Sequence, residues 1–394
     1  MNTRRFAGLA GALLLLAACT DTTGPTHSEP PGVTQIEQSQ ASQVAAGRLI
    51  VTLRPGVDQS AVARDHRIVP DFVYNNAIRG FAGSAAGGAM AALMADSRVV
   101  AVEPDGIMEI VTTQTNPTWG IDRIDQRATA LSGSYTYTNT GAGVIAYIID
   151  TGLRFDHTEF GTRAITGFDA VDGGSADDCN GHGTHVGGTV GGATYGVAKG
   201  VSLVGVRVLN CSGSGTTSGV IAGIDWVAGH HVAGAPAVAN MSLGGGASAA
   251  LDAAVSNAIA DGVTFTIAAG NGNKGGVAQD ACKYSPARVA AAITVSATNQ
   301  SDAKASWANY GNCVDLFAPG VGITSAWYTS ATATGTISGT SMATPHAAGV
   351  AALFLQSNSG ASPAAVRQAL YDASTKGVVT SSKTTNNHLL FTSY

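Results

Sequence analysis

Long apolar runs in the second part of the chain predict a parallel β-sheet. Four continuous apolar segments have the length of strands, and two helical stretches lie between them. The predicted strands are residues 143–149, 202–209, 237–241 and 263–269, and the predicted helices are 219–228 and 249–260. Strands that are apolar on both faces and alternate with helices favour an α/β fold, in which a mostly parallel sheet is sandwiched by helices. Functional side chains of such sheets lie outside the carboxyl ends of the strands.

A shorter pattern of strand, helix and strand precedes this region. Residues 48–53 and 99–103 read as strands and residues 88–95 as a helix, which predicts a small α+β domain ending near residue 110. The polar stretch 112–118 predicts a linker suited to cleavage. The expected organisation is a signal at 1–19, a Thr-, Ser-, Pro- and Gln-rich linker at 20–47, the small domain at 48–111 and the main domain at 112–394.

The first residues have the pattern of an export signal. Arg4 and Arg5 precede an apolar run over residues 6–18, which is too short for a permanent membrane span. Leu16-Ala-Ala-Cys19 also resembles a bacterial lipobox, in which Cys19 is acylated; plain cleavage after a small residue is the alternative. We therefore expect a secreted protein, with a transient lipid anchor as one route.

Composition agrees with export of a compact protein. Charged residues make up 12% of the chain, hydrophobic residues 45%, and the net charge is −5, which argues against disorder and against nucleic-acid binding. The signal contains Cys19, which leaves Cys179, Cys211, Cys282 and Cys313. An even number suits two disulfides in an oxidising compartment, in any of three pairings; four buried thiols are the alternative.

Three polar motifs stand where strands give way to helices. Asp150 directly follows an apolar strand, His182 lies in a Gly-rich segment with His185, and Ser341 precedes a helix expected to start near Pro345. Each alone has an ordinary interpretation, as a turn or cap Asp, as loop or metal-binding histidines, or as an N-cap Ser. Together they supply a nucleophile, a base and the carboxylate that orients the base.

The order of these residues narrows the class of enzyme. Asp, His, Ser differs from the order in α/β-hydrolases and in the chymotrypsin group. Asn271 follows another apolar strand, where its amide, with the backbone N–H of Ser341, is expected to stabilise an oxyanion; a simple turn Asn is the alternative.

Five ordered motifs carry a family resemblance. They are Asp150-Thr-Gly, His182-Gly-Thr-His-Val, Asn240-Met-Ser-Leu-Gly-Gly, Ala269-Gly-Asn and Gly339-Thr-Ser-Met-Ala-Thr-Pro-His. From about residue 119 to 390 the chain resembles the subtilisin superfamily, most of all the aqualysin-like bacterial enzymes of its proteinase K branch. The resemblance implies a serine endopeptidase with a subtilisin-like fold and with Asp150, His182, Ser341 and Asn271 as catalytic residues. Residues 48–110 resemble the family's inhibitory pro-domain.

The resemblance also implies a substrate cleft. Ser242, Leu243 and Gly244 would form one wall, Ser214 and Gly215 the facing edge, and Ala268, Ala269 and Gly270 the floor of the first pocket. Small uncharged residues there predict a preference for apolar or aromatic side chains, on a peptide that adds as a strand. Ordinary sheet core and turn glycines are the alternative for all of them.

Disulfides and calcium are implied in the same way. The Cys positions resemble the pattern Cys179–Cys211 and Cys282–Cys313. One calcium site would use Asp315 with the carbonyls of Ala290 and Ala292, although the proline usual at the first of these is absent. A second site would use Asp122, Asp125 and Gln126, with Ser132 and Ser134. Surface carboxylates that cap helices are the alternative.

The sequence thus predicts a secreted endopeptidase that acts on polypeptides, is a monomer and is made as a precursor. Self-cleavage is expected between Val111 and Thr112, with the small domain acting as inhibitor and folding aid. Two other functions are considered. A catalytically inactive exported binding protein is disfavoured by the complete set of catalytic residues, and an esterase or lipase by their order and by the extended cleft.

Overall fold

The computed structural model describes residues 44–106 and 112–394, with side chains from residue 47 onward. The expected signal, Cys19 and the residues on the amino side of the expected cleavage, Met108 and Val111, lie outside the described residues. The chain divides after Met108 into two compact units. Among the described residues, no helix has the length and apolarity needed to cross a membrane.

The first unit is a four-stranded antiparallel sheet with two helices. The sheet order is β2-β3-β1-β4. Its elements are β1 (Val44–Leu53), α1 (Gln59–Asp65), β2 (Val69–Tyr74), β3 (Gly80–Ser84), α2 (Ala89–Met94) and β4 (Val99–Gly106). The strands predicted at 48–53 and 99–103 lie within the longer β1 and β4, and the helix predicted at 88–95 contains α2. A small core around Val51, Phe81 and Leu93 holds the unit together.

The second unit is built on a nine-stranded sheet in the order β18-β19-β15-β14-β12-β10-β7-β9-β8. All neighbours pair in parallel except β18 and β19, so the predicted parallel sheet is confirmed. The strands are β7 (Ile145–Asp150), β8 (Ala164–Asp169), β9 (Ser202–Arg207), β10 (Ala237–Met241), β12 (Thr264–Ala268), β14 (Ile293–Thr298), β15 (Leu316–Pro319), β18 (Thr375–Lys376) and β19 (His388–Leu389).

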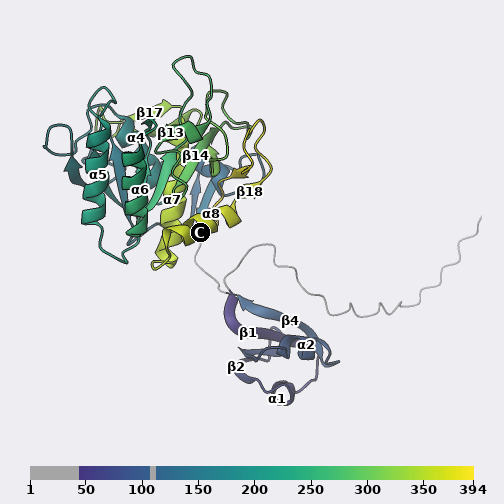
Figure 1. Ribbon diagram of the computed structural model, residues 1–394. Coiled ribbons are helices and arrows are strands. Elements are labelled where there is room, and N and C mark those ends of the chain that lie inside the picture. Colours follow the sequence, from purple (N-terminus) through teal and green to yellow (C-terminus); the bar gives the residue numbers. More distant parts are fainter. Residues whose placement is uncertain (1–43, 107–111) are drawn as a thin grey trace, which may run out of the picture. The chain divides into compact units, whose positions relative to one another are not determined.

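Helices cover both faces of this sheet (Figure 1). They are α3 (Trp119–Ile124), α4 (His182–Gly191), α5 (Thr217–His230), α6 (Ala249–Ala260), α7 (Thr340–Ser357) and α8 (Pro363–Ala373), with a short 3₁₀ turn, η1 (Ala281–Lys283). One core cluster joins the sheet to α4, α7 and α8, and a separate one joins it to α5 and α6. The sheet is therefore buried on both sides, as its continuous apolar strands require.

Three two-stranded sheets complete the unit. They are β5 (Thr112–Thr115) with β6 (Ser134–Tyr137), β11 (Gly245–Gly246) with β13 (Tyr284–Ser285), and β16 (Ile323–Ala326) with β17 (Thr334–Ile337). The first of these corrects the prediction of a linker at 112–118, because Thr112 to Thr115 pair antiparallel with β6. Four Thr and Gln residues at an exposed edge look like a linker in sequence but can still form a ladder.

The helix expected near Pro345 begins five residues earlier, at Thr340, so Pro345 lies inside α7. Proline has no N–H, and the carbonyl of Ser341, one turn earlier, loses its helical partner. That carbonyl instead accepts a hydrogen bond from Ser242 Oγ at 2.7 Å. The carbonyl that Pro345 leaves free in α7 therefore binds Ser242, the residue that follows β10.

Candidate active site

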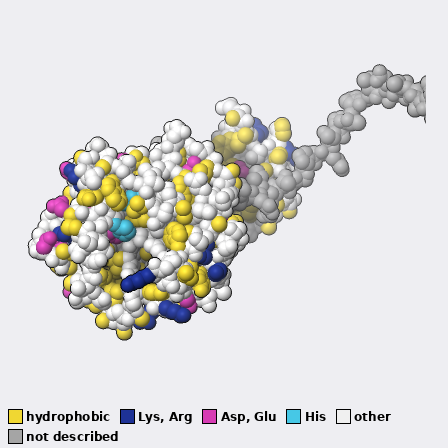
Figure 2. Space-filling view, turned by 90° about the horizontal axis from the view of Figure 1, so that it is seen from above, with side chains coloured by type: hydrophobic (Ala, Val, Ile, Leu, Met, Phe, Trp, Pro, Cys, Tyr) yellow, Lys and Arg dark blue, Asp and Glu magenta, His cyan; other side chains and the backbone are white. Residues whose placement is uncertain are grey.

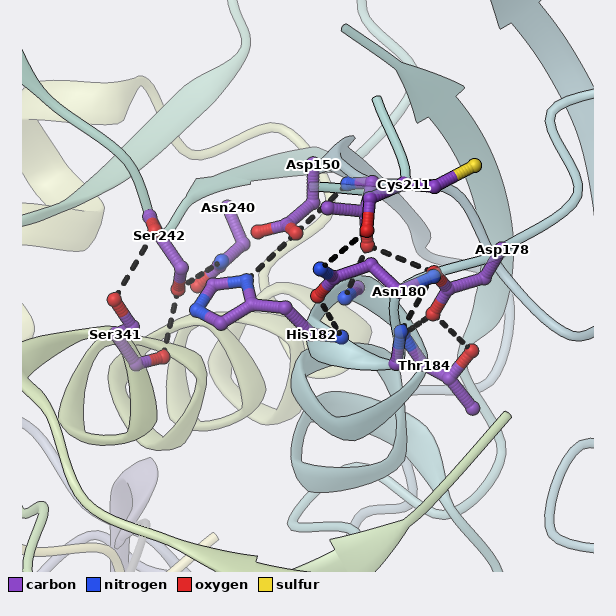
Figure 3. Close-up of polar contacts among 12 residues, drawn as sticks. Asp150, Asp178, Asn180, His182, Thr184, Cys211, Asn240, Ser242 and Ser341 are labelled. Carbon is purple, nitrogen blue, oxygen red and sulfur yellow. Dashed lines mark hydrogen bonds and ion pairs between the residues drawn. The ribbon is translucent and has the colours of Figure 1, made fainter. Parts of the chain in front are cut away.

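The three residues predicted to act together come from three elements of the larger unit. Asp150 is the last residue of β7, His182 the first of α4 and Ser341 the second of α7. Figure 3 shows the His182 ring between Asp150 and the pair formed by Ser242 and Ser341. The fold therefore brings the predicted triad together at the carboxyl edge of the parallel sheet, where functional groups of such folds gather.

Asp150 and His182 form a directed contact that is buried on the Asp150 side and partly exposed on the His182 side. The distance from His182 Nδ1 to Asp150 Oδ1 is 2.7 Å, and the same oxygen accepts the N–H of Thr151 at 2.8 Å. Asp150 is fully buried, and its Oδ2 has no hydrogen-bond partner in the described part of the chain. A carboxylate only accepts, so Nδ1 carries the hydrogen and Nε2 is left as the basic nitrogen.

Burial and charge oppose each other at His182. Burial lowers its pKa, but the charge and hydrogen bond of Asp150 and the charge of Asp178 raise it more. The net pKa of His182 lies above the usual 6.5. The site therefore strengthens the imidazole as a base.

Ser341 is held by its neighbour Ser242 in a reciprocal pair. Ser341 Oγ donates to the carbonyl of Ser242 at 3.1 Å, while Ser242 Oγ donates to the carbonyl of Ser341 (Figure 3). Within residues 44–106 and 112–394, no hydrogen bond joins Ser341 Oγ to His182. Rotation about the Cα–Cβ bond is the movement that would form it, and such contacts commonly tighten only with substrate bound.

Asn271 is oriented by its oxygen. Asn271 Oδ1 accepts from the backbone N–H of Thr340 at 2.8 Å and from Thr340 Oγ1 at 2.9 Å. Its Nδ2 is left without a hydrogen-bond acceptor among the described residues. The N–H of Ser341, in the first turn of α7, has no intrahelical acceptor. Two free donors are therefore fixed beside the nucleophile.

A cleft of ≈ 410 Å³ opens beside His182. Of the eight predicted substrate-binding residues, five line it: Ser214, Gly215, Ser242, Leu243 and Gly244. The other three, Ala268, Ala269 and Gly270, do not line this cleft, and the side chains of Ala268 and Ala269 are buried. In Figure 2, which looks at the larger unit from above, histidine atoms reach a surface where uncharged and hydrophobic side chains predominate.

Several cleft residues were not predicted. They are Thr151, Asn180, Leu209, Gly213, Thr217, Val220, Gly245, Gly246 and Leu251. Gly245 and Gly246 continue the predicted wall at 242–244, and their position next to it was an available signal. Val220 and Leu251 lie on helices, where an apolar residue facing a cleft has the same sequence signature as one facing the core.

Both disulfides implied by the family resemblance are present, Cys179–Cys211 and Cys282–Cys313. The first joins the loop before α4 to the loop after β9. Asn180 Nδ2, next to that bridge, donates to the Cys211 carbonyl at 3.0 Å. One edge of the cleft is thus cross-linked directly beside His182.

The first predicted calcium site does not fit a metal ion. Asp315 Oδ1 accepts from Arg367 Nη2 at 2.6 Å and from the Tyr371 hydroxyl at 2.8 Å, and Oδ2 accepts from the N–H of Thr294 at 2.7 Å. The carboxylate is nearly buried, and the guanidinium already neutralises it. Ala292 is buried beside it, whereas Ala290 is exposed. The chain's own cation stands where the resemblance implied calcium.

The second predicted site keeps an unused oxygen. Asp122 accepts from Ser132 N and Oγ and from Gly133 N, and Asp125 Oδ2 accepts from Thr136 N. Asp125 Oδ1 is buried with no partner in the described part of the chain. Burial, with the charge of Asp122 adding to it, raises the pKa of Asp125 to about 6. A hard cation would relieve both the repulsion and the unsatisfied oxygen.

The other members of that site contribute less. The carbonyl of Gln126 already accepts Arg123 Nη1 at 2.7 Å, and its side-chain amide donates to the carbonyls of Ala128 and Ala130. Ser134 Oγ contacts Ser132 Oγ. Across residues 44–106 and 112–394, no three His, Cys, Asp or Glu side chains are grouped to hold a metal.

Comparison with known proteins agrees with this geometry. The family described as "Subtilase family" matches residues 141–390. An extracellular serine proteinase of Thermus sp. (strain Rt41A) is 58% identical over 326 residues, which cover 82% of this chain and 78% of the relative. Alkaline serine exoprotease A of Vibrio alginolyticus is 52% identical over 333 residues, 83% of this chain but 61% of that longer protein.

A solved structure gives the same result. The crystal structure of a cold adapted subtilisin-like serine proteinase superposes with a TM-score of 0.67 at 55% identity, covering 70% of this chain and 98% of that one. The family match, the identities above one half and the shared fold lead to one conclusion: the chain belongs to the subtilase family and is a serine endopeptidase.

Proposed function

We propose that Ser341 is the nucleophile and His182 the general base. Asp150 orients the imidazole of His182 and stabilises its protonated form. The observation that carries this proposal is the 2.7 Å contact between a fully buried carboxylate and His182 Nδ1, beside a serine in the first turn of a helix. Ser341 Oγ attacks the scissile carbonyl carbon while its proton passes to His182 Nε2.

The next steps use the same groups. The tetrahedral oxyanion is held by Asn271 Nδ2 and the N–H of Ser341. The C–N bond then breaks as His182 Nε2 returns its proton to the leaving amine, which leaves an acyl ester on Ser341. Water adds to the ester by the reverse route, with His182 again taking and returning the proton. Asp150 stays ionised throughout and stabilises the imidazolium.

The cleft indicates the kind of substrate. No Asp, Glu, Lys or Arg is among its lining residues, and Leu209, Val220, Leu243 and Leu251 contribute apolar surface. An extended polypeptide would lie between Ser214–Gly215 and Ser242–Gly244 and bind through its backbone. We therefore propose broad specificity with a preference for apolar or aromatic side chains before the cleaved bond.

We further propose that the enzyme is secreted as a precursor and processes itself between Val111 and Thr112. The extracellular relative supports secretion. A cut before Thr112 would leave β5 whole and paired with β6 inside the larger unit. Residues 48–111 would then act as inhibitor and folding aid, and the mature enzyme would be a monomer freed from any lipid on Cys19.

Calcium, where it binds, is proposed at Asp122 and Asp125. It would supply positive charge to the unused oxygen of Asp125 and fix the turn between α3 and β6. This site lies outside the catalytic set, so its expected effect is on stability and not on turnover.

Ser341→Ala tests the proposal. Wild type and Ser341→Ala are expressed in a host that lacks other proteases, assayed on casein, and sequenced from their N-termini. We expect wild type to be active with a chain starting within a few residues of Thr112, and the variant to be inactive with the Val111–Thr112 bond intact. A variant that hydrolyses casein at the wild-type rate would remove Ser341 from the mechanism. An inactive variant that is still cut would remove self-processing alone.

A further inference from the structure

One carboxylate near the active site has no role in the mechanism above. Asp178 lies in the loop between β8 and α4, four residues before His182. Figure 3 shows it on the side of His182 away from Ser341, above the first turn of α4. Its two oxygens accept five hydrogen bonds, more than the loop needs for a simple turn.

The first set of bonds replaces a missing helix cap. α4 begins after Gly181, whose φ is 108° and which has no side chain to cap the helix. Asp178 Oδ1 accepts the N–H groups of Asn180 and Gly181, both at 2.9 Å, and Oδ2 accepts the N–H of Thr184 at 2.9 Å and its hydroxyl at 2.6 Å. The N-terminal end of a helix carries a partial positive charge, so the negative charge of Asp178 is also favourable there.

The second set connects this helix to the strand of Asp150. Thr151 Oγ1 donates to Asp178 Oδ1 at 2.9 Å and accepts the N–H of Gly183 at 2.9 Å. Thr151 is fully buried and its own N–H bonds Asp150. The Asp178 carboxylate therefore links Thr151, which follows Asp150, to the first turn of the helix that begins with His182.

Resting on the proposed role of His182, we infer that Asp178 is a positioning residue for that base. It fixes the start of α4 against the end of β7, and its charge favours the protonated imidazole that forms during the reaction. The groups that face His182 are Asp150 from β7, Asp178 from the preceding loop and His185 from the next turn of α4. Asp178 is the one carboxylate of these that does not touch the ring in Figure 3.

Asp178→Asn removes the negative charge and replaces one acceptor oxygen by an NH₂ group. That group would face the N–H and O–H donors that now bond the carboxylate. Because the loop and helix start must then shift, kcat should fall on the order of 10-fold to 10²-fold, since small misplacements of catalytic groups have effects of that size. KM should change little, because Asp178 does not line the cleft. The acid limb of the kcat/KM profile should move to lower pH, because a charge that raises the pKa of His182 is lost.

Two further variants separate charge from geometry. Asp178→Glu keeps the charge but displaces the oxygens, so we expect a lowered kcat with an acid limb close to that of wild type. Asp177→Asn is the matched control, because it removes the same charge from the adjacent residue. Its exposed side chain accepts a hydrogen bond from Ser175 and, among the described residues, accepts none from α4. This control should retain wild-type kcat and acid limb.

Rates are normalised to active sites labelled by a fluorophosphonate, and melting temperatures are recorded beside them. The inference is overturned if Asp178→Asn keeps the wild-type kcat and acid limb, or if Asp177→Asn changes both by as much. It is also overturned if the Asn variant loses only melting temperature. If that variant does not fold, Asp178→Glu decides, since wild-type kcat there would refute positioning. Activity surviving in Ser341→Ala would instead refute the proposed function itself.

Discussion

Two buried histidines should make the folded enzyme sensitive to acid. His185 and His346 have 0% and 1% of their surface exposed. Burial lowers the pKa of each to about 4, although hydrogen bonds to the carbonyls of Ile323 and Met342 act in the opposite direction. In the unfolded chain the same side chains titrate near 6.5. As the pH falls, these two histidines therefore become protonated in the unfolded chain before they do so in the folded protein.

The sign and size of the effect follow from these values. Above pH 6.5 the two neutral histidines do not reduce the free energy of unfolding. As the pH falls from 6.5 toward 4 the free energy of unfolding decreases, because only the unfolded chain gains protons in that window. At pH 5 each histidine should cost about 2 kcal/mol, and below pH 4 about 3 kcal/mol, from 1.36 kcal/mol per pKa unit. Both together represent a large part of the stability of an ordinary domain.

His185→Gln tests this estimate. The Gln Nε2 is placed to keep the bond that His185 Nε2 makes to the Ile323 carbonyl at 2.9 Å, while the titrating ring is lost. Between pH 7.5 and pH 5 the variant should lose about 2 kcal/mol less unfolding free energy than wild type. Val186→Ala, on the next residue of α4, is the control, because a cavity should lower stability equally at both pH values.

The measurement is urea unfolding of mature enzyme inactivated at Ser341 by a sulfonyl fluoride, so that autolysis does not interfere. Tryptophan fluorescence is a suitable signal, since Trp327 lies 6.2 Å from His185. Parallel losses of stability with falling pH in wild type and His185→Gln would refute the assignment of acid sensitivity to this buried ring.

Three further predictions concern catalysis and calcium. Asn271→Ala should lower kcat by about 10²–10³-fold with KM nearly unchanged, as for a lost oxyanion donor in a subtilisin; a loss confined to KM would contradict the role of Asn271. The raised pKa of His182 places the acid limb of kcat/KM above pH 6.5, and activity should rise through it as the base deprotonates; an optimum near pH 4 would point to a carboxyl mechanism. A chelator should shorten the half-life at high temperature far more than it slows turnover at 25 °C, and Asp125→Asn but not Asp315→Asn should abolish that sensitivity; equal half-lives with and without chelator would exclude structural calcium.

The sheet and the chain order of the catalytic residues could be predicted because short stretches of sequence determine both. The predicted strands 202–209 and 263–269 became Ser202–Arg207 and Thr264–Ala268, and the helix 249–260 has the same bounds in the structure. Errors fall at the ends, where side-chain caps decide: the helix predicted at 219–228 is α5, Thr217–His230, which Thr216 caps. The edge strand β8 was not predicted, because its half-exposed residues form no continuous apolar run.

Contacts between distant residues were beyond prediction. Arg367 is 52 residues from Asp315, and nothing near either residue signals their ion pair. Asp178 stands in a loop with Asp172 and Asp177, and composition does not distinguish the one that caps α4 from the two that are exposed. The hydrogen bond from Ser341 Oγ to Ser242 depends on a side-chain rotation that sequence does not encode.

That pair of serines explains how the fold keeps the nucleophile and the substrate in register. Asn240, fully buried at the end of β10, donates from Nδ2 to Ser242 Oγ at 2.9 Å and accepts from Thr266 of β12. Ser242 Oγ in turn holds the carbonyl that Pro345 leaves free in α7. The wall proposed to bind the peptide and the residue proposed to attack it are therefore attached to the same strand end. A shift of that strand would move both together, so their relative position, on which a near-attack geometry depends, is preserved.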